Sequence, residues 1–325
     1  MKICVFGAGA IGGHLAARLA KGGADTSLIA RGPQLAAIQA RGLRVTTPEE
    51  TIHVHPRAAA TAAELGPQDA VIITTKQTAL PSVAAAIGPL LGPGTSVSFV
   101  MNGVPWWYFD HEGGPQQGKR LPLVDPGDTI RGAVGVERTL GGVIWSACTI
   151  IEPGVIQVAT KGDRLILGEP DGSLSPRARA VAEAFKAGGM GCRVSDDIRQ
   201  ELWLKLIGNL ANGPLCTAAR QNIKAMLADP VLRQASLRCM AEGIAIARAL
   251  GVTIDMDPEA RLAASGGTAH RPSILQDLDA RRPMEIRSLF DMPLEMAREL
   301  GVPTPTLDLC VALVRQQALN EGIAT

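Results

Sequence analysis

The sequence predicts an α/β protein in two domains, an N-terminal domain built on a parallel sheet and an all-helical C-terminal domain. Residues 2–6 form a short apolar run that ends at a glycine-rich turn, and apolar residues at helical spacing follow it. Strand and helix patterns then alternate up to about residue 100, whereas helical patterns dominate from about residue 175. We therefore divide the chain into two domains, 1–195 and 196–325.

Composition and charge narrow the class of protein. The chain has 325 residues, of which 46% are hydrophobic and 19% charged, and 32 Lys and Arg nearly balance 31 Asp and Glu. These values are typical of a globular chain and exclude a disordered one. The net charge of +1 provides no basic footprint for nucleic acid. No apolar run reaches the roughly 18 to 20 residues of a membrane helix, so we expect neither nucleic acid nor a membrane as partner.

The cysteines and histidines indicate no metal site. The six cysteines are scattered, none within three residues of another, which is typical of buried thiols in a reduced compartment. Because the N-terminus also lacks a secretory signal pattern, we expect a cytoplasmic protein. His53 and His55 occupy alternate positions on one strand face, where a solvated face is favoured over a metal site.

The N-terminal domain follows from its alternating elements. Ile11, Leu15 and Leu19 repeat at helical spacing until Gly22-Gly23 ends the pattern. A second strand at 26–30 completes a β-α-β unit. The elements that follow are a strand at 70–74, a helix at 79–91, a strand at 96–100, and several strands in the glycine-rich and β-branched stretch 131–169.

The C-terminal part is predicted to be helical, with proline and glycine at its joints. Gly213-Pro214 and Gly301-Val302-Pro303 mark two of these joints. The helices are expected at 175–188, 197–212, 229–250, 285–300 and 304–320.

The glycine-rich turn is a dinucleotide-binding signal, because it follows a strand and opens a helix. We expect Gly7 to form the tight turn, Gly9 to let the backbone approach a pyrophosphate, and Gly12 to let the helix pack close to the strand. The free N–H groups and the dipole of the helix start would bind the phosphates. This pattern favours a Rossmann-type domain over a turn without ligand, and the turn's candidate cofactor-binding residues are Gly7, Ala8, Gly9, Ala10, Ile11 and Gly12.

The end of the second strand bears on which dinucleotide binds. An NAD site usually places an acidic residue there, whereas this chain has Ala30 and then Arg31. A guanidinium suits the 2′-phosphate of NADP(H), which we therefore prefer over NAD; the alternative is a solvated surface arginine. Lys76 follows the strand at 70–74, on the side where such sheets bind ligands, and is a second cofactor candidate.

A second group of polar residues lies in the C-terminal part. Lys205, Asn209 and Asn212 are spaced i, i+4 and i+7, close to one stripe of the helix 197–212. This spacing suggests a cleft, although a surface Lys205 paired with Glu201 would also satisfy it. Ser273 and Glu285 flank a short loop further on, and Glu285 opens a helix, where helix capping alone explains a carboxylate.

With these motifs in place, the sequence resembles the ketopantoate reductase (2-dehydropantoate 2-reductase) family over nearly its whole length. The resemblance rests on GAGAIG at 7–12, Arg31, Lys76, Asn102-Gly103, Leu202-Trp203-x-Lys205-Leu206 with Asn209, and Pro272-Ser273-x-Leu275-Gln276-Asp277 with Glu285. It implies NADPH-dependent reduction of a 2-oxo acid to a 2-hydroxy acid, with ketopantoate to pantoate in pantothenate biosynthesis favoured. The resemblance implies that Lys205 is the general acid and that Glu285 binds the hydroxyl end of the substrate.

The resemblance also implies that Asn102, Asn209 and Ser273 line the substrate cleft, with Asn102 near the cofactor as well. The sequence departs from the family at Gly213, where a second Asn is usual, and Asn212 stands one place earlier as its partial substitute. A second departure is His270, three residues before Ser273, where the family commonly has Asn. Because both departures lie near the presumed cleft, they bear on ketopantoate as the substrate more than on NADPH as the cofactor.

Other functions remain open. A paralogous 2-oxo acid reductase, a non-catalytic NADPH-binding regulatory protein and a dehydrogenase of 3-hydroxy acids are the alternatives. The set Lys205, Glu285 and Asn102 favours a reductase, because a mere binder has no need of it. A homodimer through the helical domain is a further expectation.

Aromatic residues are scarce, and four of the ten form one run, Trp106-Trp107-Tyr108-Phe109. The run directly follows the turn that begins at Asn102. Two interpretations stand at even weight: an aromatic wall of the substrate pocket, or an anchor for the glycine-rich stretch 110–128 or for a subunit contact.

Overall fold

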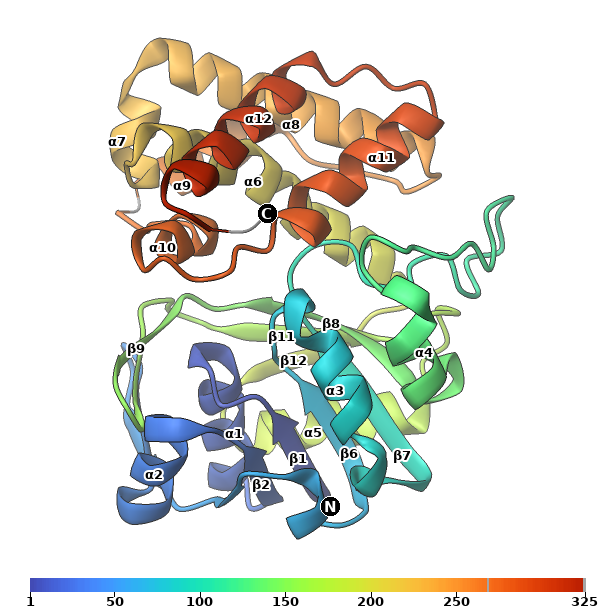
Figure 1. Cartoon of the computed structure of the whole chain (residues 1–325), viewed down its shortest axis with the longest axis vertical. Helices are drawn as coiled ribbons and strands as arrows, with labels where there is room; N and C mark the ends of the chain where they lie inside the picture. The colour runs from blue at the N-terminus through green and yellow to red at the C-terminus, as the bar shows by residue number, and fades with distance from the viewer. Residues whose placement is uncertain (268, 324–325) are drawn as a thin grey trace. The chain divides into compact units, whose positions relative to one another are not determined.

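A computed structural model describes residues 1–267 and 269–323, which divide into two compact units (Figure 1). The first unit comprises Met1–Met101 and Pro105–Ile198, and the second comprises Asn102–Val104 and the chain from Arg199 onward. The first unit is α/β and the second is helical, so the predicted fold class is confirmed. The division falls at Ile198, against the predicted boundary of 195, and the loop Asn102–Val104, predicted within the first domain, groups with the second unit.

An eight-stranded sheet forms the centre of the first unit. All its neighbouring strands pair in parallel except β8 and β11, which are antiparallel. Strand β1 lies between β2 and β6, so the loops after these three strands meet at one edge of the sheet. In order across the sheet, the strands are β12 (Gly191–Val194), β11 (Arg164–Gly168), β8 (Thr139–Trp145), β7 (Leu91–Val100), β6 (Gln68–Ile73), β1 (Lys2–Phe6), β2 (Asp25–Ile29) and β5 (Arg57–Ala59).

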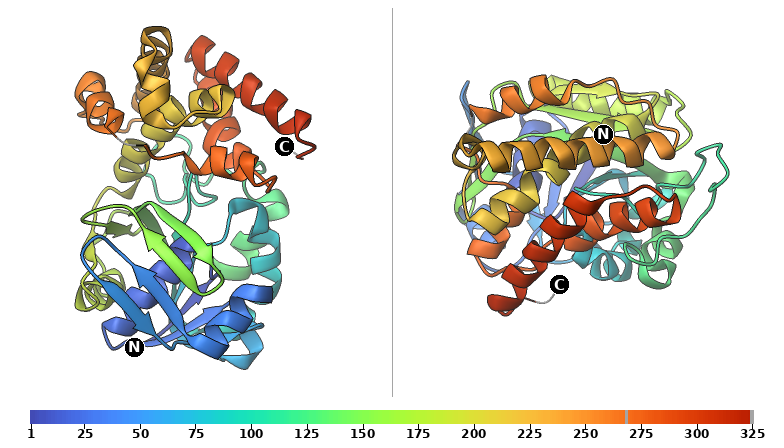
Figure 2. Two further views of the ribbon diagram at one scale, coloured as in Figure 1. Left: turned by 90° about the vertical axis from the view of Figure 1, so that its left-hand side faces the viewer. Right: turned by 90° about the horizontal axis from the view of Figure 1, so that it is seen from above.

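A second, four-stranded sheet covers helix α1 (Ala10–Lys21), as the left panel of Figure 2 shows with its blue and green strands. The packing is close: a Cβ added at Gly13 would lie 2.2 Å from Ile156 Cδ1. Its strands are β4 (Thr51–Val54), β3 (Leu43–Thr46), β10 (Val155–Val158) and β9 (Cys148–Glu152).

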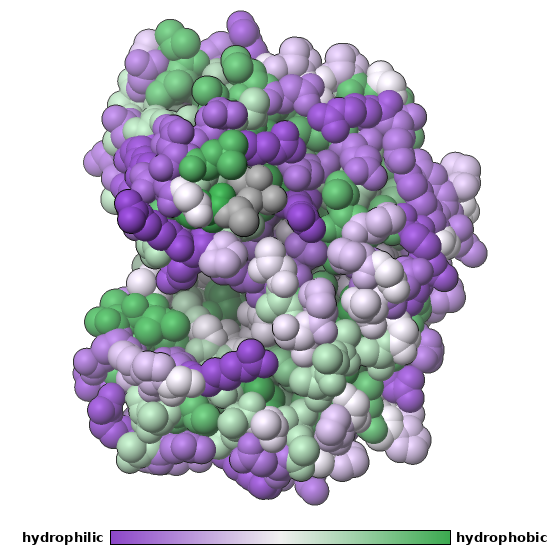
Figure 3. Space-filling view, in the orientation of Figure 1, coloured by the Kyte–Doolittle hydropathy of each residue, from purple (hydrophilic) through white to green (hydrophobic). Residues whose placement is uncertain are grey.

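Strand β9 is the edge of this second sheet. Its Ile150 and Ile151 are exposed, and an apolar patch lies over β9 at the left of Figure 3. The sequence predicted strands across 131–169, but the stretch begins with helix α4 (Thr129–Val134). The glycine and β-branched content that favoured strands there also characterises Thr129–Val134, which is too short for a helical period to show.

The remaining helices of the first unit are short or amphipathic. Helix α1 buries Leu15 and Leu19 and ends at Gly22, as predicted. Helix α2 (Gly32–Arg41) was not predicted, because it has few apolar residues on its buried face. The other α-helices are α3 (Leu80–Ala86) and α5 (Pro176–Ala187), and the 3-10 turns are η1 (Ala62–Glu64), η2 (Gln77–Ala79), η3 (Gly88–Leu90), η4 (Pro126–Asp128) and η5 (Val136–Arg138).

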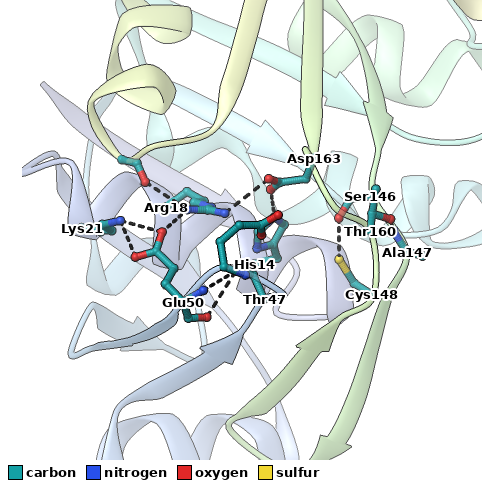
Figure 4. A network of polar contacts seen from close by, with 12 residues as sticks. His14, Arg18, Lys21, Thr47, Glu50, Ser146, Ala147, Cys148, Thr160 and Asp163 are labelled. Atoms are coloured by element: carbon teal, nitrogen blue, oxygen red, sulfur yellow. Dashed lines mark hydrogen bonds and ion pairs between the residues drawn. The ribbon is translucent and has the colours of Figure 1, made fainter.

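A buried ionic network ties α1 to the loop before β11 (Figure 4). The His14 ring nitrogen Nε2 lies 2.5 Å from Asp163 Oδ2, and Arg18 donates to Asp163 Oδ1 at 3.3 Å. Arg18 also donates to Glu50 Oε1 at 2.7 Å. Burial opposes ionisation of Asp163, but the hydrogen bond and charge of His14, together with the charge of Arg18, hold the pKa of its carboxyl below the usual value.

The aromatic run packs into the first unit. All four rings are at least 98% buried, and Trp106 meets Phe99 edge to face with ring centroids 5.6 Å apart. Arg131 lies 4.9 Å from the Trp106 ring centroid and donates to Asp110 at 3.0 Å. The Phe109 carbonyl accepts from Gly118 N at 2.7 Å. These contacts favour the anchor over the pocket wall.

The second unit packs its helices around α8. Helices α7, α9, α11 and α12 all contact α8. None of the helices described is long and apolar enough to cross a membrane, and the described residues contain no cluster of three metal-ligating side chains. The elements are α6 (Ile198–Ala219), α7 (Ile223–Ala228), α8 (Pro230–Ala249), α9 (Pro258–Gly266), α10 (Ser273–Asp279), a π-helical turn η6 (Arg287–Asp291), α11 (Met292–Glu299) and α12 (Pro305–Asn320).

Helix α6 corrects one sequence-based boundary. Gly213-Pro214 was predicted to end it, but the helix continues through both residues to Ala219. Thr217 Oγ1 donates to the Gly213 carbonyl at 2.8 Å, and Leu215 and Cys216 are buried. Tertiary burial of this last stretch thus outweighs the breaking tendency of the proline.

The buried network predicts a specific stability effect. Asp163→Asn should lower the free energy of unfolding at pH 7 by about 3 kcal/mol, because it removes the charge of the buried carboxylate that pairs with both His14 and Arg18. Because the pKa of Asp163 is lowered on folding, its contribution is present above the unfolded-state pKa of about 4 and is lost as the pH falls below it. Urea unfolding between about pH 3 and pH 7 measures both effects, and the variant should show the weaker pH dependence.

The control for this experiment is Glu50→Gln, which changes a carboxylate of the same network that is 34% exposed. It should cost no more than about 1 kcal/mol. An equal loss in both variants would show that the burial of Asp163 has no special weight.

Candidate functional site

The glycine-rich turn folds as the sequence requires. Gly7 has a φ of +112°, in the region that favours glycine. A Cβ added at Gly12 would lie 1.8 Å from the Gly7 carbonyl oxygen and 2.4 Å from Thr74 Oγ1. Helix α1 therefore begins directly against the end of β1, and Thr74 Oγ1 donates to the Gly7 carbonyl at 2.7 Å to fix the turn.

The start of α1 is open. Its N-cap is Gly9, no side chain accepts from the N–H groups of the first turn, and that turn contains no acidic residue. A Cβ added at Gly9 would meet nothing within 4 Å. Unpaired N–H groups and the positive end of the helix dipole suit an anion such as a phosphate.

Two cations follow the strands on either side of β1. Arg31 comes after β2 as the N-cap of α2; it is exposed, and its side chain forms no hydrogen bond or ion pair with the residues that the structure describes. Lys76 comes after β6, at the start of η2. Because β2 and β6 both run parallel to β1, the two side chains belong to the same edge of the sheet as the glycine-rich turn.

Thr75 is a residue at this edge that the sequence analysis did not select. Its methyl group lies 2.9 Å from a Cβ added at Gly7. Its hydroxyl oxygen is buried and has no hydrogen-bond partner among the residues described. In the sequence, Thr75 is only a hydroxyl residue between the strand end and Lys76. Such residues are common at strand ends, so the sequence alone did not single it out.

Lys205 is the centre of the candidate site in the second unit. It lies on α6, half-buried, and its Nζ donates to Asn102 Oδ1 at 2.9 Å. Burial lowers the pKa of Lys205 to about 8, and the negative charge of Glu285 partly opposes the shift. The structure thus brings together three residues that lie far apart in the sequence and were selected from it.

Glu285 is 7% exposed. It directly precedes the helical residue Ile286, and its carbonyl accepts from Leu289 N at 3.2 Å. It therefore stands at a helix start, as predicted. A capping role does not fully account for Glu285, because its negative charge also acts on the Lys205 ammonium.

The other candidates differ in placement. Asn209 is half-buried one turn beyond Lys205, and Ser273 is exposed at the first position of α10. Asn212 is 6% exposed, and its Oδ1 accepts from Ser236 Oγ of α8 at 3.1 Å. Its amide oxygen is therefore engaged within the helical unit.

Gly213, where the family usually has Asn, borders two apolar side chains. A Cβ added there would lie 3.3 Å from Phe290 and 3.5 Å from Ile274. A larger side chain at Gly213 would have to displace them.

Together these residues can perform two tasks. The edge of the first unit offers unpaired N–H groups, an exposed guanidinium and an ammonium, a set that suits a phosphorylated dinucleotide. In the second unit an ammonium with a lowered pKa lies beside a carboxylate and amides, a set that suits proton donation to a polar substrate.

Comparisons with known proteins agree with this arrangement. The family model of ketopantoate reductase PanE/ApbA matches residues 3–172, and the model of its C-terminal part matches residues 197–318. A 2-dehydropantoate 2-reductase of Mesorhizobium japonicum is 44% identical, with 99% of each chain covered. The crystal structure of a putative ketopantoate reductase from Ralstonia solanacearum shares 42% identity at a TM-score of 0.92, with 99% of each chain covered.

A more distant structure shares the fold. It is a D-mandelate dehydrogenase in a ternary structure with NADH and anilino(oxo)acetate, 21% identical at a TM-score of 0.82, with 99% of this chain and 100% of that chain covered. The two family matches span most of both units, and the resemblance inferred from the sequence is confirmed. The chain belongs to the ketopantoate reductase family of oxidoreductases.

Proposed function

We propose that this protein reduces a 2-oxo acid to the 2-hydroxy acid with NADPH, and that the acid is 2-dehydropantoate, as in pantothenate biosynthesis. The observation that carries the proposal is the cluster of Lys205, Asn102 and Glu285 in the second unit. The name of the 44% identical relative supports the choice of substrate.

The first unit fits a pyridine dinucleotide. The open helix start beyond Gly9 would hold the pyrophosphate, and the buried, unpartnered hydroxyl of Thr75 lies beside the same turn. Arg31 would pair with a 2′-phosphate, which favours NADP(H), and Lys76 would contact phosphate or ribose. When bound, the reduced cofactor supplies a hydride to the ketone carbon.

Lys205 supplies the proton. Negative charge develops on the ketone oxygen as the carbonyl is reduced, and a positioned ammonium both stabilises that charge and donates to it. With a pKa near 8, Lys205 is mostly protonated at pH 7 yet releases its proton more readily than an ordinary lysine. Its bond to Asn102 Oδ1 holds the ammonium in place.

The remaining residues would bind the two ends of the substrate. Glu285 accepts from the hydroxyl of 2-dehydropantoate, while Asn209 and Ser273 donate to its carboxylate. Asn212 would donate its amide N–H groups to the same carboxylate, while its oxygen accepts from Ser236 Oγ.

A paralogous reductase with a different 2-oxo acid is the second candidate. The observation that favours it is Gly213, where the resemblance leads us to expect Asn: a Cβ there would lie 3.3 Å from Phe290 and 3.5 Å from Ile274, so this position offers no polar group one turn beyond Asn209. A 2-oxo acid without a hydroxyl group would lose less from the absence of that polar group than 2-dehydropantoate would.

A substrate panel tests the proposal. We expect purified protein to oxidise NADPH with 2-dehydropantoate faster than with other aliphatic or aromatic 2-oxo acids. Lys205→Ala should lower kcat about a hundredfold or more, with NADPH binding retained by fluorescence titration. The matched control, Lys224→Ala, alters an exposed lysine of α7 and should leave kcat unchanged. A near-normal kcat for Lys205→Ala would remove Lys205 from its role, and oxidation with no acid would favour a non-catalytic binder.

The pKa of Lys205 predicts a basic limb in the pH profile. Because the proton donor must be charged, kcat should be constant below pH 8 and fall about tenfold per pH unit above it. Steady-state rates at saturating substrate measure this limb. A kcat that stays flat up to about pH 10 would show that the proton comes from a group with an ordinary lysine pKa or from elsewhere.

Arg31 predicts the cofactor preference. Arg31→Ala should raise KM for NADPH about tenfold or more, through loss of a charge-assisted hydrogen bond, and leave KM for NADH within about twofold. Arg44→Ala, at an exposed arginine of β3, is the control. Equal KM values of the wild type for the two cofactors would contradict the assignment of Arg31.

A further inference from the structure

The loop Asn102–Val104 leaves the end of β7 yet groups with the helical unit. Its first residue holds Lys205 through the hydrogen bond to Asn102 Oδ1. The position of Asn102 therefore depends on what anchors the next two residues.

Two contacts anchor them, and both are to the backbone of Ser288. Val104 N donates to the Ser288 carbonyl at 2.9 Å. A Cβ added at Gly103 would lie 2.4 Å from the Ser288 carbonyl carbon and oxygen and 2.8 Å from Leu289 N. Because these are backbone atoms of a helical turn, no side-chain rotation can make room. Gly103 also has a φ of +81°, which disfavours any other residue.

The Ser288 carbonyl is available because of the turn in which it lies. In an α-helix it would accept from Met292 N, but within the π-helical turn Arg287–Asp291 the Met292 N–H goes to the Arg287 carbonyl. The next donor along a π-helix would be residue 293, which is proline and has no N–H. The Ser288 carbonyl is thus left without a helical partner, and Val104 N takes the place of one.

We infer that the π-helical turn Arg287–Asp291, with Pro293, is a docking point that sets Asn102 against Lys205, and that Gly103 is a positioning residue for the general acid. The turn begins two residues after Glu285, so one short segment places both the carboxylate and the loop that hold Lys205. The inference rests on the proposed role of Lys205, but the geometry can be tested without turnover.

The first test is a double-mutant cycle on kcat with Gly103→Ala and Asn102→Ala. Each single variant should lower kcat about tenfold or more. The double variant should be no more than about twofold worse than Asn102→Ala alone, because both changes remove the same interaction. Effects that multiply, or a normal kcat in folded Gly103→Ala, would overturn the inference.

The second test reads Lys205 directly. Competitive acetylation with acetic anhydride over a pH series, followed by peptide mass spectrometry, gives the pKa of Lys205 in the protein without substrate. Loss of the Asn102 acceptor should lower this pKa by about one unit in Asn102→Ala, and Gly103→Ala should shift it equally. A shift in Asn102→Ala without one in Gly103→Ala would overturn the inference. If the wild type reduces no 2-oxo acid, the proposed function fails while this test still decides the docking point.

A further variant keeps the inference testable if Gly103→Ala does not fold. Pro293→Ala leaves the loop intact but adds an N–H that competes for the Ser288 carbonyl. It should lower kcat several-fold and shift the pKa of Lys205 in the same direction as Asn102→Ala. Pro305→Ala, at the start of α12, is the matched control and should do neither. Wild-type kcat and an unchanged pKa of Lys205 in Pro293→Ala would overturn the inference.

Discussion

The hydrogen bond from Lys205 to Asn102 is the interaction on which the candidate site depends. It joins residues 103 positions apart and places an ammonium in a partly buried environment. Burial of a charge is costly unless polar partners compensate it, and here an amide oxygen and a carboxylate do so. The compensation is incomplete, so the pKa of Lys205 falls to about 8 and its proton becomes easier to release. A fully paired lysine would be a more stable group and a poorer acid.

Two glycines, one in each unit, allow backbone segments to approach each other closely. Gly12 lets α1 start against the Gly7 carbonyl, which opens the first helical turn to an anion. Gly103 lets the Asn102 loop reach the Ser288 carbonyl. In each case the missing Cβ allows two backbone segments to come closer than any other residue permits. Backbone atoms fix the geometry of both contacts, so a change of side-chain rotamer cannot relax it.

Much of the fold and site was predictable from the sequence, for reasons that also explain the failures. The helical spacing of Ile11, Leu15 and Leu19 identified α1, the apolar run identified β1, and the helices α8 and α12 were predicted at 229–250 and 304–320. Short elements such as α7, α10 and β3 carry too few residues for a period to show, and tertiary contacts determine them. Lys205 and Glu285 were selected by their neighbours in sequence and by the family resemblance. The hydrogen bond of Lys205 to Asn102 and its charge interaction with Glu285 are tertiary facts that only the structure provides.

The aromatic run illustrates why position in sequence is a weak guide to role. It follows Asn102 and Gly103 directly, yet the chain passes from the second unit back to the first at Pro105. Trp106 then packs on Phe99 and beneath Arg131, whose guanidinium is held by Asp110. The run therefore belongs to the core of the first unit, whereas Asn102–Val104 is held within the second unit by the hydrogen bond from Val104 N to the Ser288 carbonyl. A loop restrained by this backbone contact has little freedom to move Asn102, and under the proposed mechanism Lys205 would owe its fixed position to that restraint.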